Sequence, residues 1–369
     1  MKITAIETIL IGIPYEHDAP KVRLSSGAVR ELMDAVYIKV ATDVGITGWG
    51  EAHGFSACAI TNAACNLVLE PMALGADIDD IPAVMTDLFR RTQGMSLNVP
   101  VRNALSGIEI ALWDIKGKAE GKPIWKLVGG DGSKILIPAY ASLLRTGKPE
   151  LETRLCTAAV SRGFRNIKVH EKNEMVVDSM TAARQTVGDD VELMLDTNCA
   201  WLPDQVIEKV RALQSIGLKW LEEPLYPTDD FTTMARIRVE TGVPVAAGEN
   251  LGTLQDFVRM IDAGAVDYAQ PDVTKFGGIA EMMKAAAIAD DCGARIEPHS
   301  PVYGPGLIAT LHVIAAMKGE AMCEYYFSDL AESPLGEWAI PKDGYLRVPD
   351  GPGLGVEVDE DIVGRYRIG

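Results

Sequence analysis

The chain has 369 residues and a formal net charge of −17, with 35 Lys and Arg against 52 Asp and Glu. A surface this acidic repels phosphate backbones and anionic lipid headgroups, which argues against a nucleic-acid or membrane partner. Hydrophobic residues make up 47% of the chain and charged residues 24%, the balance of a globular protein with a full core, so extensive disorder is excluded.

The sequence also carries indications of cellular location. The N-terminus lacks the basic start and apolar block of a signal peptide, and no apolar run approaches the ~20 residues that span a bilayer. The six cysteines lie far apart, without the paired spacing of a disulfide frame or a zinc site. We therefore expect buried thiols and a cytoplasmic protein.

The first part of the chain predicts a small α+β domain. Apolar residues recur over 3–11, and two further strand patterns, 36–40 and 47–51, are separated by a turn signal and predict a hairpin. Helical periodicity follows and is clearest over 104–117. Strands followed by helices favour a domain in which the two kinds of element are segregated.

From about residue 129, strand and helix patterns alternate. Amphipathic helices are expected between the strands, for example over 205–216. This regular spacing is typical of a (β/α)₈ barrel. A doubly wound open sheet is the alternative, but no phosphate-binding loop accompanies the strands, so we favour the barrel. The eight strand candidates are 136–140, 164–169, 192–195, 218–221, 243–247, 266–270, 295–297 and 321–323.

Ionisable residues follow the ends of these strands in a common register, at intervals of 23 to 27 residues. A single acid at a strand end usually caps a helix or faces solvent. A whole series in one phase indicates a site, because side chains at the ends of neighbouring barrel strands converge on one axis. The series is Lys168 with His170, then Asp196, Glu222, Glu249, Asp272, His299 and Glu324.

Three carboxylates on consecutive strands, Asp196, Glu222 and Glu249, predict a metal site. Buried together without a cation, they would repel one another and become protonated. An all-oxygen ligand set suits Mg²⁺, with Mn²⁺ as the alternative, and leaves positions open for a substrate.

The chain resembles the enolase superfamily and, within it, the mandelate racemase/muconate lactonizing enzyme family. The resemblance runs nearly end to end and rests on residues 104–118, 196–198, 220–224, 248–250, 270–272, 275–278, 298–299 and 349–355. It implies an α/β fold in which an α+β capping domain closes over a modified TIM barrel, (β/α)₇β. We accordingly expect a capping domain at 1–128, the barrel at 129–327, and a C-terminal segment, 328–369, that packs back on the capping domain. The resemblance also suggests that the protein is a homo-oligomer.

The resemblance points to the mandelate racemase branch. The lactonizing and dipeptide-epimerising branch is similar overall but places a Lys where this chain has Asp272. The resemblance implies that Glu222 is the metal ligand of its motif, whereas Glu223 is expected either to support the ligands from outside or to be structural. One departure stands out: the branch often ends its second strand Lys-x-Lys, and this chain has Lys168-Val169-His170.

The implied chemistry is Mg²⁺-dependent removal of the proton α to a carboxylate through an enediolate intermediate. Lys168 is expected to contact the substrate carboxylate, and a protonated Glu324 to donate a hydrogen bond to the enolate. His299, oriented by Asp272, and His170 are the expected acid/base groups on opposite faces.

We expect an acid-sugar dehydratase that forms a 2-keto-3-deoxy acid from a small carboxylic acid substrate. A racemase, epimerase or lactone cycloisomerase is the enzymatic alternative. A non-catalytic binding protein is disfavoured, because such a protein would be expected to have lost metal ligands that this chain retains. The polar loop 17–26 and the segment 51–55 are expected to cover the site, with Lys21, Arg23 and His53 as candidate substrate contacts.

Overall fold

The N-terminal part of the chain contains an antiparallel sheet. The computed structural model describes residues 1–21, 29–55, 57–95, 99–172 and 174–368. Strands β1 (Ile3–Glu16), β2 (Leu32–Thr42) and β3 (Thr47–Ala52) follow one another as antiparallel neighbours, and β2 and β3 form the predicted hairpin. The short β12 (Asp329–Leu330) adds to the outer edge of β1, so a late segment of the chain completes this sheet.

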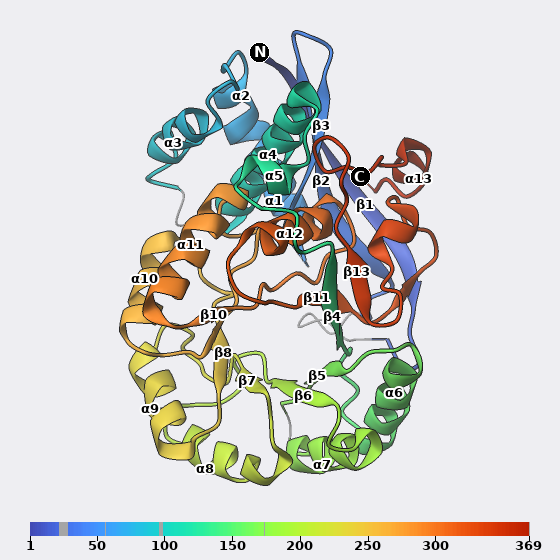
Figure 1. Cartoon of the computed structure of the whole chain (residues 1–369), viewed down its shortest axis with the longest axis vertical. Coiled ribbons are helices and arrows are strands. Elements are labelled where there is room, and N and C mark those ends of the chain that lie inside the picture. Colours follow the sequence, from blue (N-terminus) through green and yellow to red (C-terminus); the bar gives the residue numbers. More distant parts are fainter. Residues whose placement is uncertain (22–28, 56, 96–98, 173, 369) are drawn as a thin grey trace.

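The long helix α4 lies directly against this sheet and between it and the second part of the chain (Figure 1). Gly50 on β3 permits this close approach, because a Cβ there would lie 1.9 Å from the carbonyl oxygen of Gly107 on α4. The helical elements of this part are α1 (Cys58–Ala64), a π-helical turn (Cys65–Leu69), α2 (Glu70–Ala73), α3 (Ile81–Arg91), α4 (Val99–Glu120) and α5 (Ile124–Leu127).

Eight parallel strands form the second part, and each overlaps one of the predicted strands. Their spatial order is β10-β9-β8-β7-β6-β5-β4-β11. The strands are β4 (Leu136–Ser142), β5 (Asn166–His170), β6 (Glu192–Asp196), β7 (Trp220–Glu222), β8 (Val245–Ala247), β9 (Tyr268–Ala269), β10 (Arg295–Ile296) and β11 (Cys323–Tyr326).

One α-helix follows each of the first seven strands in the described part of the chain, and the helices surround the strands (Figure 1). This arrangement confirms the expected capped, modified (β/α)₇β barrel. The helices are α6 (Pro149–Ser161), α7 (Val176–Val187), α8 (Val206–Arg211), α9 (Phe231–Thr241), α10 (Leu254–Asp262), α11 (Ile279–Cys292) and α12 (Pro305–Ala316).

The helix predicted over 205–216 is wrong in its length. α8 ends at Arg211, and a separate 3₁₀ turn covers Gln214–Ile216. The backbone N–H of Ile216 donates to the carbonyl of Leu213, a three-residue step that tightens the chain before Gly217 reverses it with a φ of +68°.

A side-chain hydrogen bond links the two end strands of the barrel sheet, and the C-terminal segment packs against both parts of the chain. No backbone ladder joins β10 to β11 among the described residues, but Glu297 accepts a hydrogen bond from the backbone of Met322 at 2.7 Å. The strand β13 (Tyr345–Arg347) pairs with β4, whereas the residues after α13 (Glu360–Arg365) hydrogen-bond to β1. The last segment thus contacts both parts.

The expectation that the cysteines are buried is correct for four of the six thiols. Cys292, at the end of α11, is exposed, and Cys199, in the loop after β6, is partly exposed. Both lie where the chain leaves the packed elements, which the spacing of cysteines in the sequence does not reveal. Within the described residues, all helices are too short or too polar to cross a lipid bilayer.

Candidate active site and metal centre

Most of the ionisable residues predicted from the strand ends lie at or just beyond the carboxyl ends of the barrel strands, whereas Lys168 and Glu324 lie within β5 and β11. His170 is paired in register with Asp196, and Asp196 with Glu222, so three consecutive strands end side by side. Glu249 lies two residues beyond β8. Parallel strands place their carboxyl ends at the same rim of a barrel, which brings these side chains together from segments distant in sequence.

Asp196, Glu222 and Glu249 converge so that one carboxylate oxygen from each lies within 4.8 Å of the others. Asp196 and Glu222 are fully buried. Burial and the neighbouring carboxylates raise the pKa of Glu222 to about 7, although the Lys168 charge opposes them. Three oxygen donors that repel one another in a desolvated position fit a hard divalent cation.

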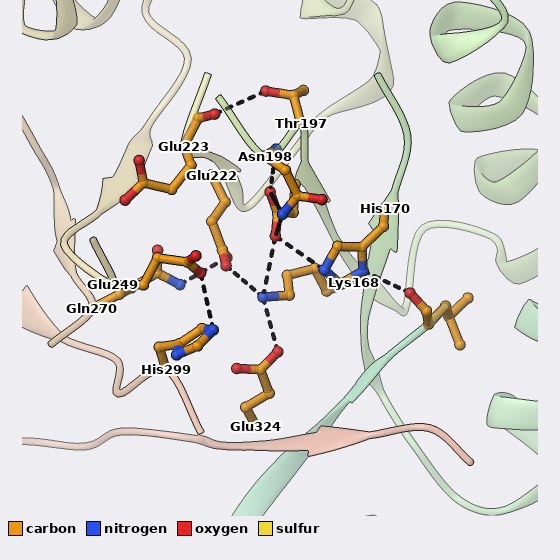
Figure 2. Close-up of polar contacts among 12 residues, drawn as sticks. Lys168, His170, Thr197, Asn198, Glu222, Glu223, Glu249, Gln270, His299 and Glu324 are labelled. Atoms are coloured by element: carbon orange, nitrogen blue, oxygen red, sulfur yellow. Dashed lines mark hydrogen bonds and ion pairs between the residues drawn. The ribbon is translucent and has the colours of Figure 1, made fainter. Parts of the chain in front are cut away.

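The Lys168 side chain is buried in the centre of this cluster. Its ammonium contacts Glu222, lies 3.0 Å from Glu324 Oε1 and is 3.9 Å from Asp196 Oδ2 (Figure 2). Burial lowers the pKa of Lys168, but the carboxylates outweigh it and hold the pKa well above its ordinary value. Lys168 therefore carries a positive charge among these carboxylates in this structure.

His299 and Asp272 form the expected dyad. His299 donates from Nδ1 to Asp272 Oδ2 at 2.6 Å, and its Nε2 lies 3.0 Å from Glu249 Oε2. The other oxygen of Asp272 accepts from the backbone and hydroxyl of Thr274, which fixes the carboxylate. Burial disfavours the imidazolium, but the charge of Glu249 and the bond to Asp272 hold the pKa of His299 well above its ordinary value. His299 can therefore deliver a proton.

His170 approaches the cluster from the side opposite His299 (Figure 2). Its Nδ1 donates to the carbonyl oxygen of Leu143 at 2.6 Å. Because a carbonyl can only accept, this bond leaves Nε2 as the nitrogen that faces the site, 3.0 Å from Asp196 Oδ2. Two imidazoles thus flank the carboxylates.

The surroundings of Glu324 in this structure oppose the expected protonated state. Burial raises the pKa of Glu324, but the charges of Lys168 and His299 outweigh it and lower the pKa to about 2. Glu324 Oε2 also accepts a hydrogen bond from the backbone of Ser300 at 2.9 Å, which favours the ionised form. Sequence spacing places Glu324 correctly but does not show that two cations face it.

The predicted substrate contacts differ in where they lie. His53 is close to the dyad: its Nδ1 is 3.9 Å from Asp272 Oδ2, and burial lowers its pKa to about 3, so it is neutral. Lys21 instead pairs with Glu31 at 2.9 Å on the surface of the N-terminal part. Arg23 lies outside the described residues.

Glu223, expected to be structural, turns its carboxylate away from the three converging ligands (Figure 2). Its Oε1 accepts a hydrogen bond from the backbone of Gly248 at 3.0 Å. The backbone leaves the regular strand at Glu223, whose φ is +40°, and this turns the side chain in a different direction from that of Glu222. The adjacent acids Glu222 and Glu223 therefore have different environments.

Two residues near the site were not singled out from the sequence. Arg145, three residues beyond β4, hydrogen-bonds to the side chain of Asn198, which in turn donates to both oxygens of Asp196 at 3.0 Å. Lys275 lies close enough to lower the pKa of Asp272, together with His299. Arg145 is the first ionisable residue after the first predicted strand, where the predicted series has no member, and this was the signal that the sequence offered.

Comparisons with known proteins agree with this geometry. Residues 7–129 match the family model of the mandelate racemase / muconate lactonizing enzyme N-terminal domain, and residues 151–362 match the model described as enolase C-terminal domain-like.

Individual relatives match over nearly their whole length. An arabinonate dehydratase from Saccharolobus solfataricus is 32% identical over 364 residues, 96% of each chain. A 3,6-anhydro-alpha-L-galactonate cycloisomerase from Streptomyces coelicolor is 32% identical over 378 residues and 100% of each chain. The crystal structure of a racemase from Streptomyces coelicolor A3(2) with bound magnesium superposes with a TM-score of 0.84 at 29% identity, over 99% of this chain and 100% of that one.

Proposed function

Since the chain belongs to the mandelate racemase/muconate lactonizing enzyme family of the enolase superfamily, we propose that it is a Mg²⁺-dependent acid-sugar dehydratase. The observation that carries the proposal is the placement of three converging carboxylates between two imidazoles at one rim of the barrel. The similarity to an arabinonate dehydratase and to a magnesium-bound racemase supports it. The Asp272–His299 pair favours the mandelate racemase branch.

Asp196, Glu222 and Glu249 are the proposed Mg²⁺ ligands. The bound ion supplies a positive charge that holds the substrate carboxylate and neutralises the charge that develops on it. Lys168 adds a second fixed charge beside that carboxylate, and Glu324 holds the Lys168 ammonium in place.

The two histidines have separate proposed tasks. His170 removes the α-proton through Nε2, because its Nδ1 already donates to a backbone carbonyl. His299 delivers its proton to the β-hydroxyl, so that the C–O bond breaks and water leaves. The resulting enol becomes the 2-keto-3-deoxy acid. Catalysis belongs to residues 129–327, and His53 from residues 1–128 contacts the distal part of the substrate.

The experiment is incubation of the purified protein with MgCl₂ and a panel of sugar acids in D₂O, followed by ¹H NMR and mass spectrometry. We expect deuterium exchange at the α-carbon of at least one acid and a product lighter by one water, both abolished by EDTA. A protein that binds Mg²⁺ but exchanges no α-proton across the panel would refute the proposal.

Lactone cycloisomerisation is the second candidate, favoured by the similarity to a cycloisomerase over the full length of both chains. It uses the same proton abstraction, but the leaving group stays attached to the product. A product that gains carbon-bound deuterium and keeps all its oxygen atoms would therefore assign cycloisomerisation or racemisation, and the loss of water would assign dehydration.

A further inference from the structure

Two uncharged donors hold one oxygen of Glu222. Trp220 donates from Nε1 to Glu222 Oε2 at 2.8 Å, and Gln270 donates from Nε2 to the same oxygen at 2.7 Å. All three side chains are fully buried. Buried donors and acceptors in such a position strongly restrict one another, because no water can replace a broken bond.

The local structure explains why these donors meet Glu222. Trp220 and Glu222 are two residues apart on β7, so their side chains point to the same face of the strand. The Trp220 ring is packed between Tyr140 and Tyr268, with ring centroids 5.7 Å and 5.0 Å away. The orientation of the indole N–H is therefore determined by packing and not by Glu222 alone.

The other oxygen of Glu222 faces the carboxylate cluster. Oε1 contacts Lys168, whose ammonium is also 3.9 Å from Asp196 Oδ2 (Figure 2). Oε2 is turned toward Trp220 and Gln270, where its lone pairs are already used. Glu222 thus presents a single oxygen to the other two carboxylates.

We propose that Trp220 and Gln270 are positioning residues that keep Glu222 a one-oxygen ligand and thereby favour Mg²⁺ over Ca²⁺. Mg²⁺ requires near-ideal octahedral geometry, whereas Ca²⁺ accepts a larger and less regular ligand set that includes two-oxygen carboxylates. A Glu222 side chain released from its two donors can rotate and offer both oxygens, which suits Ca²⁺. The inference rests on the divalent-cation site of the proposed function.

The test uses three full-length variants. Trp220→Phe keeps an aromatic ring between Tyr140 and Tyr268 but lacks the N–H. Gln270→Met keeps the length of the side chain and removes the donor. Trp201→Phe is the matched control, because Trp201 is also buried but its Nε1 has no hydrogen-bond partner among the described residues.

Binding of MgCl₂ and, separately, CaCl₂ to chelator-treated protein is measured by isothermal titration calorimetry. Outer contacts of metal ligands typically change metal affinity by about 10- to 100-fold. We expect Trp220→Phe and Gln270→Met each to weaken Mg²⁺ binding at least about tenfold and Ca²⁺ binding less than about threefold. Trp201→Phe should leave both affinities unchanged.

Unchanged Mg²⁺ affinity, or equal loss of both cations, would overturn the inference. If Trp220→Phe does not fold, Gln270→Met decides the question, since the Gln270 Oε1 atom has no partner among the described residues and only the bond to Glu222 is lost. A wild-type protein that binds neither cation would instead refute the proposed function.

Discussion

Glu109 joins the two parts of the chain at a helix terminus, and its removal should destabilise the whole protein. It lies on α4, and its carboxylate accepts backbone hydrogen bonds from Ile279 at 2.7 Å and Ala280 at 2.9 Å, the first residues of α11. Trp113 donates a third bond from Nε1 at 2.7 Å. The first N–H groups of a helix have no partner within it, so Glu109→Ala leaves three donors, two buried and one partly buried, without an acceptor.

The magnitude follows from those three donors. Each buried donor left without a partner costs about 1–3 kcal/mol. Burial raises the pKa of Glu109 to about 7, so removing the carboxylate also relieves an unfavourable burial. We therefore expect a net loss of about 4 kcal/mol in the free energy of unfolding. For 369 residues unfolding as one unit, this lowers the midpoint of thermal unfolding by roughly 5 °C.

Calorimetry gives the midpoint, and hydrogen exchange read by mass spectrometry gives the local effect. Peptides that cover Ile279 and Ala280 should exchange faster in Glu109→Ala than in the wild type. Glu120→Ala, which changes an exposed acid on the same helix, should shift neither measurement. Retained protection at the start of α11, or equal shifts in the two variants, would refute the role assigned to Glu109.

Three further predictions concern the site and the pH dependence of stability. Glu222→Gln should abolish Mg²⁺ binding in calorimetry and leave the circular dichroism spectrum unchanged. Glu208→Gln, which changes an exposed acid on α8, is the control and should keep its Mg²⁺ affinity. Tight binding retained by Glu222→Gln would remove Glu222 from the ligand set. His299→Asn should lower turnover at least about 100-fold while α-proton exchange in D₂O persists, because His299 acts after the proton is removed; loss of exchange would make His299 the base. His312 donates from Nε2 to the carbonyl of Leu354 at 3.0 Å, and burial lowers its pKa to about 4. A histidine in the unfolded chain takes up a proton near pH 6.5, whereas His312 in the folded chain does so near pH 4. The free energy of unfolding therefore falls by about 2 kcal/mol as the pH drops from 7 to 5. His312→Asn should lose less stability over that interval in thermal unfolding, and an acid sensitivity equal to that of the wild type would contradict the assignment.

The site could be predicted to the extent that it follows the barrel register. A strand end is a local feature, marked by an apolar run that gives way to a polar residue. In a barrel all such ends lie at one rim, so sequence spacing translates into spatial proximity. The pairing of His170 with Asp196 and of Asp196 with Glu222 follows from that register alone. Arg145 was missed because it lies three residues beyond its strand, in a loop whose path the register does not determine.

The sequence by itself determined the order of the elements, the eight strands and the residues at the rim, because burial and strand periodicity depend on near neighbours in the chain. The tertiary structure alone decided the partners and charges. Burial raises the pKa of Glu324, but Lys168 and His299 reach it from other strands and lower that pKa, and Lys21 pairs with Glu31. Electrostatic interactions depend on the distance between atoms and on their burial, and for residues from distant segments both exist only once the chain has folded.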